Sequence, residues 1–393
     1  MKRVPIVERG DWRAQAAECG FRFHTIDGTR YWDERAYYAF GLRQVEDDLE
    51  DPSAELHAMA MDLVEEIVAR EALMERLAIP AAFRDWIADS WRHREPHLYG
   101  RLDLAYDGTG PAKLYELNYD TPTSLFEAAF FQWRWLEDQR EAGRLPAGAD
   151  QFNSIHEALV ARFGQLAAQL PPPLYFAAAR DSDEDQGTVD YLRDCAAQAG
   201  LHGQAIALED IGLAADGRFT ALDDTVIGAL FKLYPLEDMF ADDFGQALPG
   251  SGLRLLEPPW KALLSDKGLL PLLWERHPGH PNLLEAHFDD GGELPPGWVR
   301  KPLHSREGAN VEMRLDDGRR VASAGPYAGP CIRQRLHALP RFDGGYALVG
   351  SWIVGDAACG IGIREDDGPI TGDGARFVPH AIVEDGAPTV LYA

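Results

Sequence analysis

Three oxygen-bearing side chains alternate along one short stretch of the sequence, KLYELNYDTPTSLFEAA at 113–129; they are Glu116, Asn118 and Asp120. Because residues i, i+2 and i+4 of a strand point to one side, we expect these groups to share a face. With Asp103 in RLDLAYDG, Glu116 and Asn118 offer two carboxylates and an amide oxygen, the hard ligands that Mg²⁺ prefers. The alternative is a solvated acidic hairpin, since exposed Asp and Glu are the norm.

Four basic residues are candidates for contact with an anionic ligand. Lys267 and Lys301 can each present a compact ammonium group to phosphate oxygens. Arg101 and Arg364 can supply guanidinium groups that stabilise negative charge. Surface solubility is the alternative for the lysines, and structural ion pairs are the alternative for the arginines.

A small-residue loop and one glutamine complete the candidate nucleotide site. The loop SREGANV at 305–311 contains Gly308, where a backbone without a side chain can bring N–H groups close to phosphate oxygens. Gln334 in CIRQRL is a candidate for the adenine edge, and a core or edge-strand role is the alternative.

Two further groups are candidates for substrate contacts. We predict that Thr121 and Thr123, with the N–H groups of a helix that starts there, bind the carboxylate of an acid. Glu184 belongs to the acidic run 183–185, which follows a predicted strand at the edge where open sheets bind ligands. This run suits a polyamine or another cation, or else it complements the dipole of the following helix.

The elements that position these residues follow from periodicity and turn signals. Residues 1–100 are predicted to be mainly helical, with clear amphipathic spacing over 56–77. Residues 101–120 are predicted to form a hairpin. A helix is expected from Thr121, as N-cap, and Pro122 to Gly143.

The second half of the chain alternates strands and helices. Residues 171–207 show a βαβ pattern whose strands are expected to pair in parallel, although no GxGxxG motif follows the first strand. A proline-flanked helix carrying Lys267 is predicted within 255–284, and a strand, a loop and a strand within 298–318. The segment 331–366 is predicted to be rich in strands.

Composition restricts the class of protein. The 393 residues are 46% hydrophobic and carry a formal net charge of -26, which argues against non-specific binding to nucleic acid or to an anionic membrane. The N-terminus has no apolar segment behind its basic residues, and no run of 18 apolar residues occurs, so we expect a soluble cytoplasmic protein. The four cysteines are far apart and form no CxxC pair, so neither a zinc site nor a disulfide framework is predicted.

These motifs, taken in order, resemble the glutathionylspermidine synthase family, specifically its synthetase half and its stand-alone bacterial acid–amine ligase members. The segments that carry the resemblance, nearly end to end, are MKRVPI, YELNYDTPTSLFEAA, EPPWKALLSDKGLLPLLW, RKPLHSREGAN, GSWIVGDAACGIGIREDDGPITG and RFVPH. The residues that match the family are Arg101, Asp103, Glu116, Asn118, Lys267, Lys301 and Arg364. Thr121 and Thr123 stand where the family binds glutathione through serines.

The resemblance implies an α/β protein with a permuted ATP-grasp fold and an inserted Rossmann-like substrate domain. Residues 1–150 would supply an N-terminal helical segment and the metal-binding strands, 151–252 the Rossmann-like domain, and 253–393 the lid and the nucleotide-binding core. The implied activity is ligation of an acid to an amine with ATP and Mg²⁺, through an acyl phosphate. Arg101 and Arg364 would then stabilise the charge of the transferred phosphoryl group. A catalytically silent relative that binds nucleotide as a scaffold is the alternative.

Overall fold

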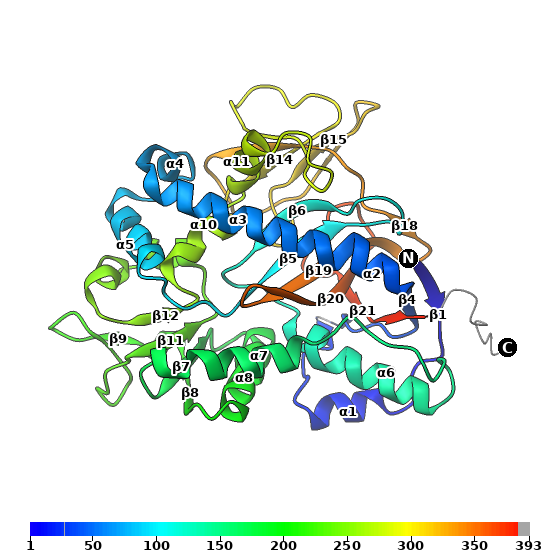
Figure 1. Cartoon of the computed structure of the whole chain (residues 1–393), viewed down its shortest axis with the longest axis horizontal. Helices are drawn as coiled ribbons and strands as arrows, with labels where there is room; N and C mark the ends of the chain where they lie inside the picture. The colour runs from blue at the N-terminus through cyan, green and yellow to red at the C-terminus, as the bar shows by residue number, and fades with distance from the viewer. Residues whose placement is uncertain (27, 384–393) are drawn as a thin grey trace.

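An antiparallel sheet at the centre of the molecule contains the predicted hairpin (Figure 1). The computed structural model in which it is seen describes residues 1–26 and 28–383. The strand order is β21-β20-β19-β5-β6, with β18 paired to β19. Its strands are β5 (Tyr99–Ala105), β6 (Lys113–Asn118), β18 (Arg341–Phe342), β19 (Gly345–Val354), β20 (Ala357–Asp366) and β21 (Arg376–Val378). The hairpin prediction is confirmed, because β5 and β6 pair antiparallel.

The two faces of this sheet are buried against different helices. Leu102 and Leu104 of β5 belong to the hydrophobic cluster that includes α3 (Asp51–Ala69), which crosses the sheet in Figure 1. Tyr99 packs in a second cluster, with α7 (Ile155–Leu166). Since side chains alternate along a strand, Arg101 and Asp103 lie on the Tyr99 face, away from α3. The burial of the even-numbered residues therefore fixes the direction of the odd-numbered ones.

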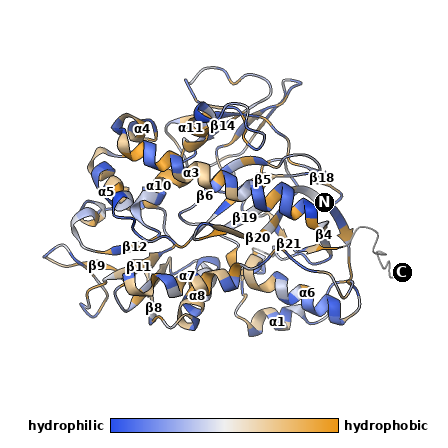
Figure 2. Cartoon of the chain, in the orientation of Figure 1, coloured by the Kyte–Doolittle hydropathy of each residue, from blue (hydrophilic) through white to orange (hydrophobic). Residues whose placement is uncertain are grey.

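The helical segment after the hairpin starts later than predicted. Thr121 and Pro122 are not helical, and the first helical residue is Leu125, followed by the π-helix η2 (Glu127–Phe131) and by α6 (Gln132–Glu141). Ser124 has a φ of +66°, a left-handed conformation that no helix continues through. The prediction of Thr121 as N-cap is wrong. The predicted end is close to correct, because Gly143 follows α6 with positive φ. Figure 2 shows hydrophobic and hydrophilic residues on both α3 and α6, as expected for helices that cover a core.

A four-stranded sheet of parallel strands lies beside the central sheet, in the green region of Figure 1. Its order is β12-β11-β7-β8, with α8 (Asp183–Gln198) packed on β7 and β8. The strands are β7 (Leu174–Ala178), β8 (Gly203–Ala207), β11 (Ala229–Lys232) and β12 (Arg254–Leu256). The predicted βαβ unit and its parallel pairing are confirmed.

A third sheet carries the strand on which Lys301 lies. Its order is β13-β17-β14-β15-β16, and every pair is antiparallel. The strands are β13 (Ala286–Phe288), β14 (Trp298–Pro302), β15 (Glu312–Arg314), β16 (Arg320–Ala322) and β17 (Cys331–Arg335). The strand, loop and strand predicted within 298–318 are therefore confirmed as β14, a loop and β15.

The prediction of a mainly helical N-terminal segment is wrong for the first 40 residues. There β1 and β4 pair antiparallel, and β4 pairs in parallel with β22 from the other end of the chain. The bounds are β1 (Lys2–Pro5), α1 (Trp12–Glu18), β2 (Thr25–Ile26), β3 (Thr29–Arg30), β4 (Ala36–Phe40) and β22 (His380–Ile382). A partner more than 300 residues away leaves no local periodicity. From Leu42 onward the segment is helical as expected, in α2 (Leu42–Val45), η1 (Glu46–Glu50), α3, α4 (Glu71–Arg76) and α5 (Ala81–Arg92).

The helix predicted around Lys267 is also divided. The structure has η6 (Pro259–Lys261), α10 (Ala262–Ser265) and α11 (Leu269–Arg276), with Lys267 in the turn between the last two. The carboxylate of Asp266 accepts a hydrogen bond from the Gly268 N–H at 2.6 Å, and the Lys267 N–H donates to the Leu303 carbonyl. These bonds replace those that a continuous helix would make.

Over residues 1–26 and 28–383, none of the helices has both the length and the apolar character that a bilayer span requires. Strands from the segments 1–150 and 253–393 share the central sheet, since β5 pairs with β19. The division into three segments stays a prediction.

Candidate functional site

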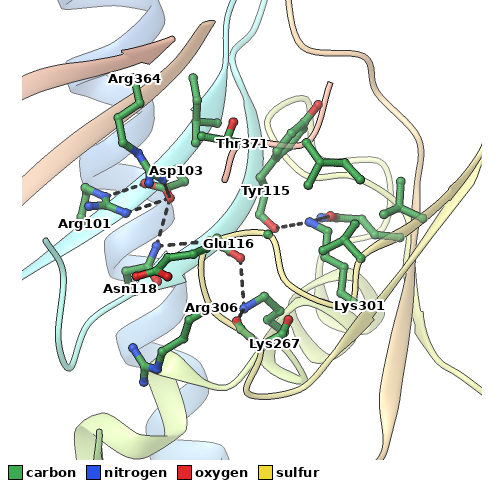
Figure 3. A pocket seen from close by; sticks show the side chains of 18 of the residues that line it. Arg101, Asp103, Tyr115, Glu116, Asn118, Lys267, Lys301, Arg306, Arg364 and Thr371 are labelled. Carbon is green, nitrogen blue, oxygen red and sulfur yellow. Dashed lines mark hydrogen bonds and ion pairs between the residues drawn. The ribbon is translucent and has the colours of Figure 1, made fainter. Parts of the chain in front are cut away.

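A cavity of about 250 Å³ separates the β5–β6 hairpin from the sheet that contains β14 and β17 (Figure 3). Eleven of the twelve residues predicted from the sequence line it: Arg101, Asp103, Glu116, Asn118, Thr121, Thr123, Lys267, Lys301, Gly308, Gln334 and Arg364. Glu184 is not in the lining, but its neighbour Asp185 is. The fold therefore brings together side chains that are up to 263 positions apart in the sequence.

The acidic residues of the hairpin come together through the strand register. Asp103 lies directly opposite Glu116, and Arg101 lies opposite Asn118. The Asn118 amide donates to Asp103 Oδ2 at 3.1 Å. Asp120 does not join them, because β6 ends at Asn118 and the alternation ends with it. Asp120 is instead fully buried.

The Asp120 carboxylate faces the parallel sheet. It accepts hydrogen bonds from the ammonium group of Lys232, at the end of β11, and from the Leu236 N–H at 2.8 Å. Lys232 and Asp120 are both fully buried, so this ion pair joins the hairpin to the parallel sheet. Breaking it would leave an uncompensated buried charge.

Two guanidinium groups hold Asp103. Arg101 donates to both carboxylate oxygens, at 2.6 and 3.0 Å, and Arg364 of β20 donates to Oδ2 at 3.3 Å. Arg101 also donates to the Thr123 carbonyl at 2.6 Å. The geometry with Arg101 is bidentate, which fixes the orientation of both partners. Arg101 thereby ties the Thr121–Thr123 segment to the central sheet.

Two lysines approach the same acidic group from the other side of the cavity. Lys267 Nζ lies 3.1 Å from Glu116 Oε2. Lys301 Nζ donates to Gln334 Oε1 at 2.8 Å and to the Tyr115 carbonyl at 3.2 Å, and it lies 5.1 Å from the centroid of the Tyr115 ring.

These charges alter one another's titration. Burial alone would raise the pKa of Glu116, but the ammonium groups of Lys267 and Lys301 outweigh it and lower the pKa to about 2. Burial and the charge of Lys267 lower the pKa of Lys301 to about 8, although the charge of Glu116 opposes this shift. Near neutral pH, Glu116 is ionised and Lys301 keeps most of its charge.

Arg306 is a site residue that the sequence reasoning missed. Its guanidinium donates to Thr121 Oγ1 at 2.7 Å and to Glu237 at 2.6 Å, the latter at the start of α9 (Leu236–Ala241). Arg306 thus joins the 305–311 loop to both the hairpin exit and α9. The signal was present, since Arg306 is the one basic residue of that loop.

Gly308 has a role that the sequence did not indicate. Its φ is +65°, and a Cβ there would lie 2.5 Å from the Thr371 carbonyl oxygen and 2.7 Å from Ile370. Glycine is therefore required for the 305–311 loop to pack against 370–371. Both segments form part of the cavity wall.

The cavity is locally basic in an acidic protein. Its lining includes six basic residues, Arg101, Lys267, Lys301, Arg306, Arg335 and Arg364, against four acidic ones, Asp103, Glu116, Asp185 and Glu307. The chain as a whole has a net charge of -26. An excess of cations at one place in such a chain favours a polyanionic ligand there.

A contrasting acidic cluster lies around the start of α8. Burial, together with the charges of Glu127, Asp185, Asp373 and Glu307, raises the pKa of Glu184 to about 8. The Ser182 hydroxyl accepts from the Asp185 N–H at 3.2 Å and caps the helix. Both predicted roles of the 183–185 run, cation binding and complementation of the helix dipole, are compatible with this position.

The donor set of the hairpin fits Mg²⁺. Within residues 1–26 and 28–383, no three His, Cys, Asp or Glu side chains gather as a metal site. Asp103, Glu116 and Asn118 supply two carboxylates and one amide, which suits a hard cation that keeps water and takes phosphate oxygens. The Asn118 amide donates to both carboxylates here, and a half-turn about its last bond would present its oxygen instead.

Comparison with known sequences gives the same family. The profile described as "Glutathionylspermidine synthase preATP-grasp" matches residues 3–383. A Haemophilus influenzae protein named "Putative acid--amine ligase" is 41% identical over 400 residues, which cover 98% of this chain and 100% of that protein.

Two longer relatives are more distant. Trypanothione synthetase of Crithidia fasciculata is 28% identical over 86% of this chain, and the bifunctional glutathionylspermidine synthetase/amidase of Escherichia coli is 24% identical over 90% of it. The chain spans 55% and 60% of their respective lengths.

Among solved structures, a glutathione synthetase-like effector from Globodera pallida in its apo form superposes with a TM-score of 0.60. The match covers 95% of this chain and 96% of that one, at 11% sequence identity, and so shows a shared mixed α/β fold alone. The family profile and the 41% identical relative show the family: this chain belongs to the glutathionylspermidine synthase family.

Proposed function

We propose that this protein is an ATP- and Mg²⁺-dependent ligase that joins a carboxylate to an amine through an acyl phosphate. The observation that carries the proposal is the cavity in which paired carboxylates, two lysines and four arginines converge from different elements. We propose a peptide-like acid and an amine or polyamine as substrates, because the related proteins are named for glutathionylspermidine and trypanothione.

We further propose the permuted ATP-grasp arrangement for this fold. The central sheet, with residues of 1–150 and 253–393, would provide the metal side of the site, and the β13–β17 sheet would provide the lid. The parallel sheet, within 151–252 and β12, would be the Rossmann-like substrate domain. The position of the cavity between the first two sheets supports this assignment.

The polyphosphate of ATP is assigned to the lysine side of the cavity. Lys267 and Lys301 are each less than a tenth exposed, and both ammonium groups face the acidic hairpin. Desolvated ammonium groups attract phosphate more strongly than exposed ones. The side-chain amide of Gln334 accepts a hydrogen bond from Lys301 and donates one to the Leu114 carbonyl. We therefore assign Gln334 to the nucleotide site as the residue that orients Lys301. Gly308 places the backbone of the 305–311 loop at the wall of this site.

Asp103, Glu116 and Asn118 are assigned to Mg²⁺. When bound, the ion would neutralise developing charge on the phosphate oxygens. The residues themselves are already held in place, since Arg101 fixes Asp103 in a bidentate contact and the β5–β6 register sets Glu116 opposite it. Lys267 would then shift from Glu116 toward phosphate.

The acid substrate is assigned to the segment after β6. Thr121 and Thr123 line the cavity, and Arg306 lies 2.7 Å from the Thr121 hydroxyl. Because the helix begins only at Leu125, the anion site rests on these hydroxyls and on the guanidinium of Arg306 rather than on the N–H groups of a first turn. A bidentate guanidinium suits a carboxylate.

The amine is assigned to the acidic cluster. Glu184 and Asp185 lie at the start of α8, and Asp185 and Glu307 line the cavity. The described residues give Glu184 no ion pair, and its pKa is raised by burial and then by neighbouring carboxylates. A cationic amine would relieve this repulsion, and Glu184 is its first proposed contact.

The proposed reaction has two steps. A carboxylate oxygen of the acid attacks the γ-phosphorus of ATP, and ADP leaves, with Arg101 and Arg364 stabilising the charge of the transferring group. The amine, having lost one proton, attacks the carbonyl carbon, and inorganic phosphate leaves. The net products are the amide, ADP, phosphate and a proton.

A mass-spectrometric screen tests this function. The purified chain is incubated with ATP, Mg²⁺, a panel of peptide-like acids including glutathione, and a panel of amines including spermidine. The expected result is a product lighter by one water than the sum of its two parts, together with ADP. Tight ATP binding without any product or phosphate release across the panel would favour the scaffold alternative.

A further inference from the structure

A second cavity, of about 580 Å³, lies outside the site described above. It is enclosed by the C-terminal halves of α3 and α7, by the end of α5 and the residues after it, by η6 and by the turn between β19 and β20. Among the residues that the structure describes, the two cavities share no lining residue. Small-molecule sites typically have volumes of about 300–1,000 Å³, so this cavity is large enough for a ligand of its own.

The floor of the second cavity is aromatic and apolar. Trp260 of η6 is 2% exposed, and its ring meets those of Trp91 and His97 edge to face, with ring centroids 5.1 and 5.2 Å away. The buried residues Pro96 and Leu166 also line the cavity. Trp91 is only half-buried, so part of its ring is open to a ligand. Such a surface accommodates a flat ring.

The three carboxylates of the second cavity already have partners in the protein. Glu65 of α3 accepts a hydrogen bond from the indole N–H of Trp91 at 2.5 Å. Glu95 accepts one from Arg254 at 2.8 Å. Asp356 lies within 3.4 Å of ring nitrogens of two histidines. Because these contacts occupy the acidic groups, a cationic ligand is not what the cavity lacks.

The basic groups of the second cavity are less completely paired. Arg94 is exposed, and its guanidinium makes no hydrogen bond or ion pair within residues 1–26 and 28–383. Arg162 of α7 donates through Nε to the His97 carbonyl at 2.9 Å and through Nη1 to Gln165 at 3.2 Å, and its Nη2 has no partner over the same residues. A guanidinium group carries five N–H donors, so unmet donors exceed unmet acceptors here. This imbalance favours an anionic ligand.

The backbone position of Arg94 is one that suits glycine. Arg94 directly follows His93, the C-cap of α5, and has a φ of +52°. Residues that end a helix in this left-handed conformation are most often glycine, because a Cβ is unfavourable there. The Arg94 N–H bonds the Trp91 carbonyl, a contact that any residue except proline can make. The arginine side chain is therefore not needed to end the helix.

His97 provides an independent sign that the wall is incomplete. Its side chain is 9% exposed, and its Nδ1 has no hydrogen-bond partner among the described residues. Buried polar atoms are nearly always paired. A further polar group therefore belongs in this part of the molecule.

We propose that the second cavity binds an aromatic carboxylate, with its ring against Trp91 and Trp260 and its carboxylate on the guanidinium groups of Arg94 and Arg162. The apolar floor selects the ring, and the unpaired N–H donors select the negative charge. A carboxylate fits better than a phosphate, because the described lining contains neither a lysine nor a glycine-rich loop of backbone N–H groups. The proposal is independent of the proposed ligase function, since the two cavities have separate linings.

Calorimetric titration with 2-naphthoate tests the proposal. The wild-type protein is expected to bind it with a Kd of about 1 mM or lower. 2-Naphthamide has the ring without the charge and should bind about tenfold more weakly, and acetate, which has the charge without the ring, should give no measurable heat. Absence of 2-naphthoate binding would overturn the proposal, as would equal binding of 2-naphthamide. Tighter binding of 2-naphthyl phosphate would overturn the choice of a carboxylate.

Two variants locate the probe in the second cavity. Arg94→Gly removes the guanidinium at a position where glycine fits, so the affinity for 2-naphthoate should fall by about tenfold or more while the protein stays folded. Trp91→Leu removes the open ring and should also weaken binding by about tenfold. The matched control is Ala78→Gly, because Ala78 follows the C-cap of α4 with a φ of +53° and lies outside the lining. Arg43→Gln, at an exposed arginine of α2, controls for loss of charge. Both controls should bind like the wild type.

Each outcome either supports the proposal or overturns it. Unchanged affinity in Arg94→Gly would overturn it. A loss of affinity in Lys301→Met that is absent from Arg94→Gly would also overturn it, because the probe would then lie in the first cavity. Thermal unfolding curves establish that each variant is folded. If Arg94→Gly does not fold, Arg94→Gln, which removes the charge and keeps a long polar side chain, decides instead.

Discussion

Buried carboxylates are paired with cations at one end of the cavity and lie among other carboxylates at the other end. At the hairpin end, each carboxylate has a cation within reach: Asp103 has Arg101 and Arg364, and Glu116 has Lys267. At the α8 end, Glu184 has mainly other carboxylates around it. The pKa of Glu116 is accordingly lowered to about 2, and that of Glu184 is raised to about 8.

The contrast teaches what each end requires from a ligand. A paired site holds its geometry without a ligand, because every buried charge is already compensated. An unpaired acidic cluster is stable only if it holds protons or receives a cation from outside. Under the proposed function, the hairpin end would be preorganised for phosphate and metal, whereas the α8 end would be completed by the amine.

The largest effect is expected at the paired end. Glu116→Gln keeps the size of the side chain but removes a charge from the proposed metal ligands, so half-saturation by Mg²⁺ should move to concentrations about 10- to 100-fold higher. A Mg²⁺ titration of ATP turnover measures this shift. Glu312→Gln, on β15 away from the cavity lining, serves as the control. An unchanged titration would show that the hairpin binds no metal.

Loss of an ammonium group on the opposite wall should have the next largest effect. Lys301→Met removes a charged hydrogen-bond donor from a buried site, and ATP affinity should fall by about 10- to 100-fold, the equivalent of about 1.5–3 kcal/mol. Calorimetric titration with ATP gives the affinity. The neighbouring variant Arg300→Met is a matched control, because Arg300 pairs with Asp289 on the other face of β14. Equal losses in both variants would mean that Lys301 has no special contact with the nucleotide.

At the unpaired end, we expect the affinity for a cationic amine to depend on pH. Burial and neighbouring carboxylates raise the pKa of Glu184 to about 8, so the group is largely protonated at pH 6 and becomes anionic as the pH rises through 8. Affinity for spermidine, which stays cationic over this range, should therefore increase several-fold from pH 6 to pH 8.5. Glu184→Gln should flatten the profile. A wild-type affinity that is constant or falls over this range would contradict the assignment.

The smallest effect is expected between the two ends, at the proposed acid site. Thr123→Val removes a hydroxyl that lines the cavity and keeps the shape of the side chain. The KM for the acid should rise about fivefold, consistent with one neutral hydrogen bond of about 1 kcal/mol, while those for ATP and the amine stay unchanged. Thr109→Val in the β5–β6 turn is the control. Unaltered kinetics for all three substrates would place the anion site elsewhere.

The sequence indicated the paired end better than the unpaired one, for a physical reason. Asp103, Glu116 and Lys301 lie in strands whose alternation can be read locally, and a motif order along the chain connected them. Asp120 was misassigned because the strand pairing ends before it, at Asn118. Its ion-pair partner, Lys232, is 112 residues away in the sequence.

The errors in the fold have the same origin. The strands β1 and β4 form a sheet with β22, and this pairing joins residues near the two ends of the described chain. The break at Lys267 depends on hydrogen bonds from the turn to Leu303, in a different part of the sequence. Periodicity predicts which face of an element is buried, but it does not give distant partners.

Oxygen transfer from the acid to phosphate tests the central claim most directly. The acid identified in the screen is labelled with ¹⁸O in both carboxylate oxygens and incubated with ATP, Mg²⁺ and the amine, and the released phosphate is analysed by mass spectrometry. The account predicts that each molecule of amide formed is accompanied by one molecule of phosphate carrying a single ¹⁸O atom, because a carboxylate oxygen attacks the γ-phosphorus and leaves with it. Unlabelled phosphate, released in step with amide or in its absence, would contradict the acyl phosphate route and with it the ligase assigned to this cavity.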